Sequence, residues 1–342
     1  MPDGKTIAHG LLSLCISPSL GKNKIQVENL KHTLNYGIDK VRFISPVKVG
    51  SFIRLKSKIA EVTIRDDKTV LVRIERMMEI KSCGVIPNRT SSLDRAKKEL
   101  QQKGCVVFQH IGLEDSATRD FALRLFKDRI IAVPEGARVL EGGEAERERL
   151  DLSNLAGQPV HTDGFAYGDL YPDFILLGCV RSSEQGGESV LVDGYQLLEN
   201  MDSSPENSEL AERLRSVAID MTEEGMQESH SPLVIETKSG RLMLRRTLEQ
   251  KPCDNSSDAK GDQEMIDLWI GAIDEAAEEA PRFKLQPGEV LVVDNYRMFH
   301  GRDPYTDADR MLWRIWVWTR DALGVPELEL ASDSRYAGLV GQ

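Results

Sequence analysis

The sequence contains no apolar run long enough to cross a membrane. A membrane-spanning helix needs about 20 predominantly apolar residues, and the apolar stretch Ile7–Ile16 is shorter and contains His9. This stretch also lacks the features of a clear signal peptide. We therefore expect a cytoplasmic protein that has no membrane partner.

Cysteine is scarce and scattered. The 342 residues include five cysteines, and no two of them have CxxC spacing. Disulfide frameworks are typical of short secreted chains that are dense in cysteine, and cysteine-based zinc sites typically contain CxxC pairs. The sequence therefore argues against both and favours a reducing compartment. The five residues are Cys15, Cys83, Cys105, Cys179 and Cys253.

Basic residues outnumber acidic ones in the first part of the chain, and acidic residues outnumber basic ones in the rest. The 44 basic and 55 acidic residues give a net charge of −11, but residues 1–90 hold 16 basic and 8 acidic residues. Residues 91–342 therefore hold 28 and 47, a net charge of −19. The acidic part would repel a phosphate backbone, which argues against a nucleic-acid partner. The basic charges alternate with apolar residues, as on a solvated sheet face.

The basic part has the alternation of a β-hairpin. Apolar and polar residues alternate in Phe52–Ile59 and in Val70–Ile74, and Arg65–Lys68 between them has the composition of a turn. Residues Thr6–Leu20 are rich in leucine and end in Ser-Pro-Ser-Leu-Gly, which predicts a short helix with a stop signal. One helix and one hairpin make a thin core.

Four short segments of this part occur in the order of a known family: Ile7–Leu12, Asn35–Phe43, Pro46-Val47 and Val49-Gly50. Over about residues 5–82 they resemble the later part of a hot-dog hydratase of the MaoC type, the enoyl-thioester hydratases. The resemblance implies a partial hot-dog α+β segment at residues 1–84. In that family the catalytic Asp and His precede the Ile-Ala-His-Gly segment, so we expect this dyad to be absent and His9 to be a packing residue.

Residues 85–342 have the pattern of a mainly β domain with inserted helices. Short apolar runs separated by turn residues predict strands. Helical spacing appears in Leu93–Leu100, Tyr195–Ala218 and Asp262–Ala280, and Cys253–Gly261 has the composition of an exposed loop. A jelly roll fits this pattern better than a doubly wound sheet. The predicted strands are Gly104–Phe108, Phe174–Val180, Ser189–Val192, Leu233–Glu236, Leu242–Leu244, Val290–Val293 and Leu312–Val317.

Two histidines and one carboxylate form a candidate metal site. His161 and Asp163 are two residues apart, so on an extended strand both project to the same face. His300 follows about 140 residues later. Two histidines and one carboxylate are the facial triad of non-haem Fe(II) oxygenases. His-x-Asp alone is a weak signal, because a chain with six histidines and 55 acidic residues contains such pairs by chance.

The surroundings of these residues strengthen the signal. Five separated motifs agree in order and spacing: His161–Phe165, Pro172–Arg181, Gly186–Ser189, Asp294–Arg302 and Arg310–Arg314. Over about residues 90–322 they resemble the taurine dioxygenase (TauD/TfdA) and clavaminate synthase superfamily of Fe(II)- and 2-oxoglutarate-dependent oxygenases. The resemblance implies a double-stranded β-helix, or jelly roll, at residues 85–342. Clavaminate synthases usually carry Glu as the acidic ligand, so Asp163 follows the taurine dioxygenase and butyrobetaine hydroxylase pattern.

The resemblance also implies a role for each matched residue. His161, Asp163 and His300 would bind Fe(II). Arg310 would hold the far carboxylate of the 2-oxoglutarate co-substrate, for which a planar bidentate donor is suited, and Ser189 would donate a hydroxyl to the same carboxylate. The alternatives are a surface ion pair for Arg310 and a locally satisfied strand hydroxyl for Ser189.

Arg314 has two interpretations. It lies four residues after Arg310, so on a strand both point the same way. The resemblance implies contact with an anionic group of the primary substrate, and the alternative is a buried structural arginine paired with an acid. Weaker candidates are Gln158 for substrate or co-substrate contact, Phe165 and Tyr167 for the pocket lining, and Asp294-Asn295 for the turn before His300. His110 and His230 receive no role.

The resemblance implies an oxidoreductase that uses Fe(II), 2-oxoglutarate and O2. We expect it to hydroxylate a C–H bond of a small polar metabolite that is amino-acid-like, betaine-like or otherwise anionic, with release of succinate and CO2. Desaturation and ring closure stay open, as does the identity of this small-molecule partner. The alternative is an inactive thioester-binding or scaffolding protein. The sequence leaves open whether the N-terminal segment packs on the oxygenase domain, pairs with itself in a homo-oligomer, is partly disordered or is an artefact of a gene fusion.

Overall fold

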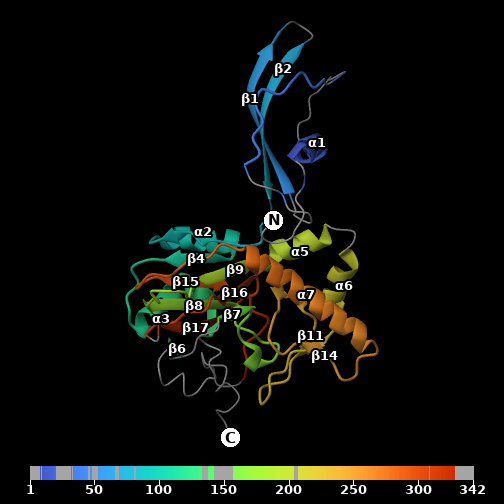
Figure 1. Cartoon of the computed structure of the whole chain (residues 1–342). Coiled ribbons are helices and arrows are strands. Elements are labelled where there is room, and N and C mark those ends of the chain that lie inside the picture. The colour runs from blue at the N-terminus through green and yellow to red at the C-terminus, as the bar shows by residue number, and fades with distance from the viewer. Residues whose placement is uncertain are drawn as a thin grey trace. The chain divides into compact units, whose positions relative to one another are not determined.

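The structure is a computed structural model, and its contacts divide the chain into two units, Met1–Ser82 and Cys83–Gln342 (Figure 1). The division falls two residues before the boundary expected from the sequence. His9 lies outside the described residues. The described residues are 8, 10–20, 32, 34–44, 47, 53–65, 69–80, 82–132, 138–141, 157–203, 207–307 and 309–327.

The first unit contains a long antiparallel hairpin, which confirms the predicted one. Its elements are α1 (Gly10–Leu20), β1 (Ile53–Ile64) and β2 (Val70–Ile80). Side chains paired across the two strands share a face, so the alternating sequence gives one mostly apolar and one mostly charged face. On the charged face the carboxylate of Glu79 accepts hydrogen bonds from Arg54 at 2.7 Å and Lys56 at 2.6 Å.

The second unit contains two main sheets that share a core. The larger has the order β3-β4-β15-β8-β17-β5, with β6 also pairing with β17, and the smaller has the order β7-β16-β9. The larger sheet consists of β3 (Arg89–Thr90), β4 (Cys105–Phe108), β5 (Ile130–Ala132), β6 (Arg138–Glu141), β8 (Phe174–Arg181), β15 (Val290–Asp294) and β17 (Met311–Thr319). The smaller consists of β7 (Gln158–His161), β9 (Ser189–Asp193) and β16 (Met298–Arg302). Short strands beside them are β10 (Ile219–Asp220), β11 (His230–Ser231), β12 (Val234–Glu236), β13 (Leu242–Leu244) and β14 (Lys251–Pro252).

Strand β15 shows how alternation assigns side chains to two layers. Leu291 and Val293 point into the core between the sheets, whereas Val290 and Val292 pack beneath helices on the outer face of the larger sheet. Every residue of β15 is buried. A continuous apolar run is the pattern of a strand covered on both faces, which is why this strand was predictable from the sequence.

Helices cover the outer faces of both sheets. Helices α2 and α3 lie on the larger sheet, and α5 and α7 lie on the smaller one (Figure 1). This arrangement confirms a mainly β architecture with inserted helices. In the described part of the chain, no helix has the length and hydropathy needed to cross a membrane. The helices are α2 (Leu93–Lys103), α3 (Asp115–Phe126), α5 (Gly194–Asp202), α6 (Ser208–Ser216) and α7 (Ala259–Glu279).

Two helix predictions were wrong in detail. The region Tyr195–Ala218 forms two helices, α5 and α6, and Pro205 stands in the sequence between them, where it cannot continue a helix. Helix α7 begins inside the predicted loop Cys253–Gly261. Its start is fixed by Asp258, whose side chain accepts a hydrogen bond from the Gly261 N–H at 3.1 Å and caps the first turn.

Residues just after the division between the units extend the smaller sheet. The Asp193 N–H donates to the Cys83 carbonyl at 2.6 Å, and the Val85 N–H donates to the Leu191 carbonyl at 3.0 Å. Arg89 Nε donates to Glu289 Oε1 at 2.8 Å, where the Glu289 side chain is only 6% exposed. The segment from Cys83 to Arg89 is therefore part of the second unit.

We predict that a chain starting at Ser82 keeps the stability of the second unit, whereas a chain starting at Ser91 loses it in part. The shorter chain lacks the hydrogen bonds along β9 and leaves the buried Glu289 without its arginine. Because Arg89 is itself exposed, losing its ion pair costs about 1 kcal/mol or less, and each lost backbone hydrogen bond costs about 1 kcal/mol. Thermal unfolding of both chains, followed by circular dichroism, tests this, and equal unfolding midpoints would contradict it.

Candidate metal centre

Two strands of the smaller sheet bring the predicted metal ligands together. His161 ends β7 and lies opposite His300 of β16, and Asp163 follows His161 by two residues. Gly301 permits the close approach of the strands, because a Cβ atom there would lie 2.7 Å from the Gln158 carbonyl oxygen. The three ligand side chains are buried.

The donor atoms of these side chains form a tight cluster. Asp163 Oδ1 lies 3.2 Å from His161 Nε2 and 3.7 Å from His300 Nε2. One donor atom from each residue lies within 4.8 Å of the others, and no second group of this kind occurs among the described residues. Two imidazole nitrogens and one carboxylate oxygen are the donor set of a non-haem Fe(II) centre. The residues therefore fit such an ion.

The two oxygens of Asp163 have different partners. Oδ2 accepts hydrogen bonds from Arg314 Nη1 at 3.0 Å and Trp316 Nε1 at 2.8 Å, while Oδ1 faces the histidines. Burial by itself raises the pKa of Asp163, but the charge of Arg314 and the two neighbouring histidines hold this pKa well below its usual range. Asp163 is therefore an anion with one oxygen fixed and the other directed at the cluster.

Both histidines are suited to bind a metal as neutral imidazoles. His161 Nδ1 lies 2.9 Å from the Pro159 carbonyl oxygen, which only accepts hydrogen bonds. Nδ1 of His161 therefore carries the proton, and Nε2 presents its lone pair to the cluster. Burial and the neighbouring His161 lower the pKa of His300, despite the nearby Asp163. Metal ligation requires this deprotonated form.

Arg310 and Ser189 line one small pocket beside the smaller sheet. Arg310 is 8% exposed and lies over the ring of Tyr305, 5.0 Å from its centroid. Burial lowers the pKa of Arg310, and no carboxylate among the described residues offsets it. A buried cation without an acidic partner is costly, so the pocket fits an anion. Its lining is Cys179, Ser182, Ser183, Gly187, Ser189, Lys284, Leu285, Arg310 and Leu312.

A tight turn brings the backbone against Arg310. Gly187 has φ +74°, and a Cβ atom at this position would lie 3.2 Å from Arg310 Nε. Only glycine adopts this conformation without strain. Gly187, which belongs to the sequence motif Gly186–Ser189, therefore also shapes the arginine pocket.

Arg314 points inward from β17, as predicted, and binds Asp163. This contact matches the alternative of a buried arginine paired with an acid, and contact with a substrate stays a prediction. Among the weaker candidates, Gln158 Nε2 lies 3.4 Å from His161 Nε2. Tyr167 packs edge-on against Trp316 and Trp318 in the core.

Other predicted residues lie outside the cluster or outside the described side chains. The Phe165 side chain is not among the described ones, and neither His110 nor His230 joins the triad. Asn295, expected only to fix a turn, contacts the backbone of Asp163. Its position after Asp294, five residues before His300, was the sole sequence signal for this contact.

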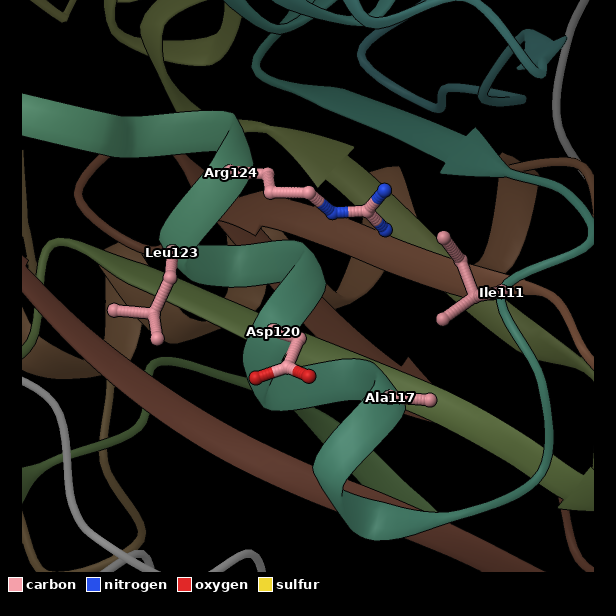
Figure 2. A pocket seen from close by; sticks show the side chains of 5 residues that line it. All are labelled: Ile111, Ala117, Asp120, Leu123 and Arg124. Atoms are coloured by element: carbon pink, nitrogen blue, oxygen red, sulfur yellow. The ribbon is translucent and has the colours of Figure 1, made fainter.

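A separate groove lies on the outer side of the second unit. Figure 2 shows it between α3 and the segment that carries Ile111. Helix α3 covers the outer face of the larger sheet, whereas the triad side chains lie on the smaller sheet. Asp120 and Arg124 are one helical turn apart in the groove, and no cluster of metal-ligating side chains gathers there within the described ranges. The groove is therefore not part of the candidate metal centre.

Comparison with known proteins agrees with both family resemblances. Residues 85–316 match the taurine catabolism dioxygenase TauD, TfdA family, and residues 2–78 match the MaoC like domain. Human gamma-butyrobetaine dioxygenase is 26% identical over 178 residues, which are 46% of this chain and 44% of that protein. The 3-hydroxyacyl-thioester dehydratase Z of Mycobacterium tuberculosis is 38% identical over 79 residues, which are 23% of this chain and 52% of that protein. The chain spans about half the length of the curated relatives it matches.

A solved structure shares the fold of the second unit. The crystal structure of asparagine oxygenase (AsnO) has a TM-score of 0.50 and 17% sequence identity, and the match covers 66% of this chain and 77% of that chain. At this identity the likeness concerns the fold alone.

We predict that His161→Ala and His300→Ala each abolish stoichiometric Fe(II) binding without unfolding the protein, because each removes one of three ligands. Asp163→Ala should bind the ion weakly through the two histidines. Calorimetric titration under anaerobic conditions measures the binding, and circular dichroism checks the fold. The matched control is His230→Ala, since His230 is half exposed and pairs with Asp220 at 3.3 Å. Normal binding by either histidine variant would contradict the ligand assignment.

Proposed function

Because the chain belongs to the taurine catabolism dioxygenase TauD, TfdA family, we propose that it is an oxygenase dependent on Fe(II) and 2-oxoglutarate. The proposed reaction converts a substrate C–H bond, 2-oxoglutarate and O2 into a C–OH group, succinate and CO2. One oxygen atom enters the product and the other enters succinate. The observation that carries the proposal is the convergence of His161, Asp163 and His300 in one buried cluster.

The protein's own residues hold and orient the reactants. His161 and His300 would bind Fe(II) through Nε2 and Asp163 through Oδ1, the atoms that face one another. When bound, Fe(II) supplies the centre at which O2 is reduced by electrons from the oxidative decarboxylation of 2-oxoglutarate. The burial of all three ligands keeps bulk water away from this centre.

Arg310 and Ser189 would bind the far carboxylate of 2-oxoglutarate. Both line the same pocket, and Arg310 brings a buried positive charge that no described carboxylate neutralises. A guanidinium binds a carboxylate through two parallel N–H···O bonds, which fixes orientation as well as charge. The co-substrate would thus be held at its unreactive end.

The domain organisation that supports this function is also a proposal. The two facing sheets would be the halves of a double-stranded β-helix within residues 85–342, as the likeness to asparagine oxygenase supports. Residues 1–84 would be a segment of the hot-dog fold, as the match of residues 2–78 to the MaoC like domain supports.

The primary substrate would be a small metabolite with an anionic group, such as an amino acid or a betaine. Gamma-butyrobetaine dioxygenase is named for a betaine, and the buried Arg314 supplies a cation next to the triad. An inactive thioester-binding scaffold is the second candidate, favoured by the N-terminal match to a thioester dehydratase. Fe(II)-dependent formation of succinate in the presence of amino acids, betaines, sulfonates or acyl thioesters separates the two, because a scaffold forms none.

We predict that Arg310→Ala raises the 2-oxoglutarate concentration needed for half-maximal succinate formation by 30-fold or more. Losing a charge-assisted bidentate contact in a buried site costs about 2–5 kcal/mol. The control is Arg181→Ala, because Arg181 is exposed and pairs only with the exposed Asp309 at 3.0 Å among the described residues. An unchanged requirement in Arg310→Ala would place the co-substrate carboxylate elsewhere.

Arg314→Ala should weaken binding of an anionic primary substrate more than binding of 2-oxoglutarate. The variant removes a buried cation beside the triad and leaves the Arg310 pocket intact. Separate titrations with substrate and co-substrate measure the two affinities. Equal losses in both would instead assign Arg314 to the support of Asp163 alone.

A further inference from the structure

Asp163 lies beyond the regular ladder of its sheet. Strand β7 ends at His161, so the backbone N–H and carbonyl of Asp163 need partners from elsewhere in the fold. The side-chain amide of Asn295 supplies both. Asn295 Oδ1 accepts from the Asp163 N–H at 3.0 Å, and Asn295 Nδ2 donates to the Asp163 carbonyl at 2.8 Å.

Asn295 is itself held firmly. It is fully buried in the turn between β15 and β16, and its Nδ2 donates a second hydrogen bond to the Pro172 carbonyl at 2.8 Å. Its own backbone N–H donates to the Asp173 carbonyl at 3.0 Å. Since all these partners are buried, the amide cannot exchange them for water without opening the core.

One side chain therefore connects the two segments that carry the triad. Asn295 lies five residues before His300, in the turn that leads into β16, and it forms hydrogen bonds with the backbone of Asp163. The carboxylate of Asp163 is fixed separately by Arg314 and Trp316. Backbone and side chain of this ligand are thus held by different parts of the fold.

We propose that Asn295 is a positioning residue that preorganises Asp163 for the metal, an inference that rests on the proposed metal centre. The Asn295 amide takes the place of a neighbouring strand: Oδ1 accepts from the Asp163 N–H, and Nδ2 donates to the Asp163 carbonyl. An ionised aspartate has nearly the same shape but only acceptors, so at this position it would face two carbonyl oxygens without a proton to donate, and a protonated aspartic acid could donate only one of the two bonds. Alanine would leave all three backbone groups unpaired.

The test is Co(II) binding to the metal-free chain of residues 1–342, measured by titration and by the visible spectrum of the bound ion. We expect Asn295→Ala and Asn295→Asp each to weaken Co(II) binding about 10–100-fold, the usual effect of losing a group that orients a metal ligand. The matched control is Asn200→Ala, because Asn200 is a buried asparagine of α5 whose amide donates to Cys83 Sγ at 3.5 Å. The control should bind Co(II) within about twofold of the wild type, since it orients no ligand.

Affinities within twofold of the wild type in both Asn295 variants, or an equal loss in the control, would overturn the proposal. A wild-type chain that binds no Co(II) would instead overturn the metal centre itself.

A measurement on the wild-type chain covers the case in which the variants do not fold. If Asn295 preorganises the site, the amide proton of Asp163 exchanges slowly with deuterium even without metal, and Co(II) changes its rate little. Fast exchange without metal that slows on adding Co(II) would show that the ion, and not Asn295, orders the segment.

Discussion

The register between β7 and β16 is the constraint on which the site depends. His161 and His300 lie opposite each other, and a slip of one residue would turn one histidine out of the core. Strand β16 is the central strand of its sheet, and Gly301 lets it approach β7 closely. The spacing of the two histidines is therefore a property of a central strand pairing.

The interior holds two separate sets of buried charges, one around Asp163 and one at Arg310. The buried anion Asp163 is matched by Arg314 on one oxygen, and burial lowers the pKa of the neighbouring His300, so an added cation would find a carboxylate oxygen that is already deprotonated. Arg310 carries positive charge with no described acid beside it. A dication bound by the triad and a dianion that extends from it to Arg310 would balance the buried charges at both places. Fe(II) and 2-oxoglutarate carry these charges.

The sequence predicted features that leave a local or repeated pattern. The apolar run of β15 and the motifs around His161 and His300 gave the core and the triad. Helix α3 was overlooked, although Thr118, Phe121, Ala122 and Leu125 have the spacing of a buried helix face. The contact of Asn295 with the Asp163 backbone was not predictable, because no pattern of side chains marks which peptide groups lack a partner in the folded chain.

The sequence left two roles open for Arg314: contact with a substrate anion and a structural pair with an acid. A guanidinium has five N–H donors, and its contact with Asp163 Oδ2 is made through Nη1. Trp316 donates to the same oxygen, so the carboxylate keeps one buried donor even when the arginine shifts toward another anion. Holding Asp163 and binding a substrate anion, as proposed, would therefore draw on the same buried charge. An anionic substrate would draw positive charge away from Asp163, which couples substrate binding to the basicity of the carboxylate ligand.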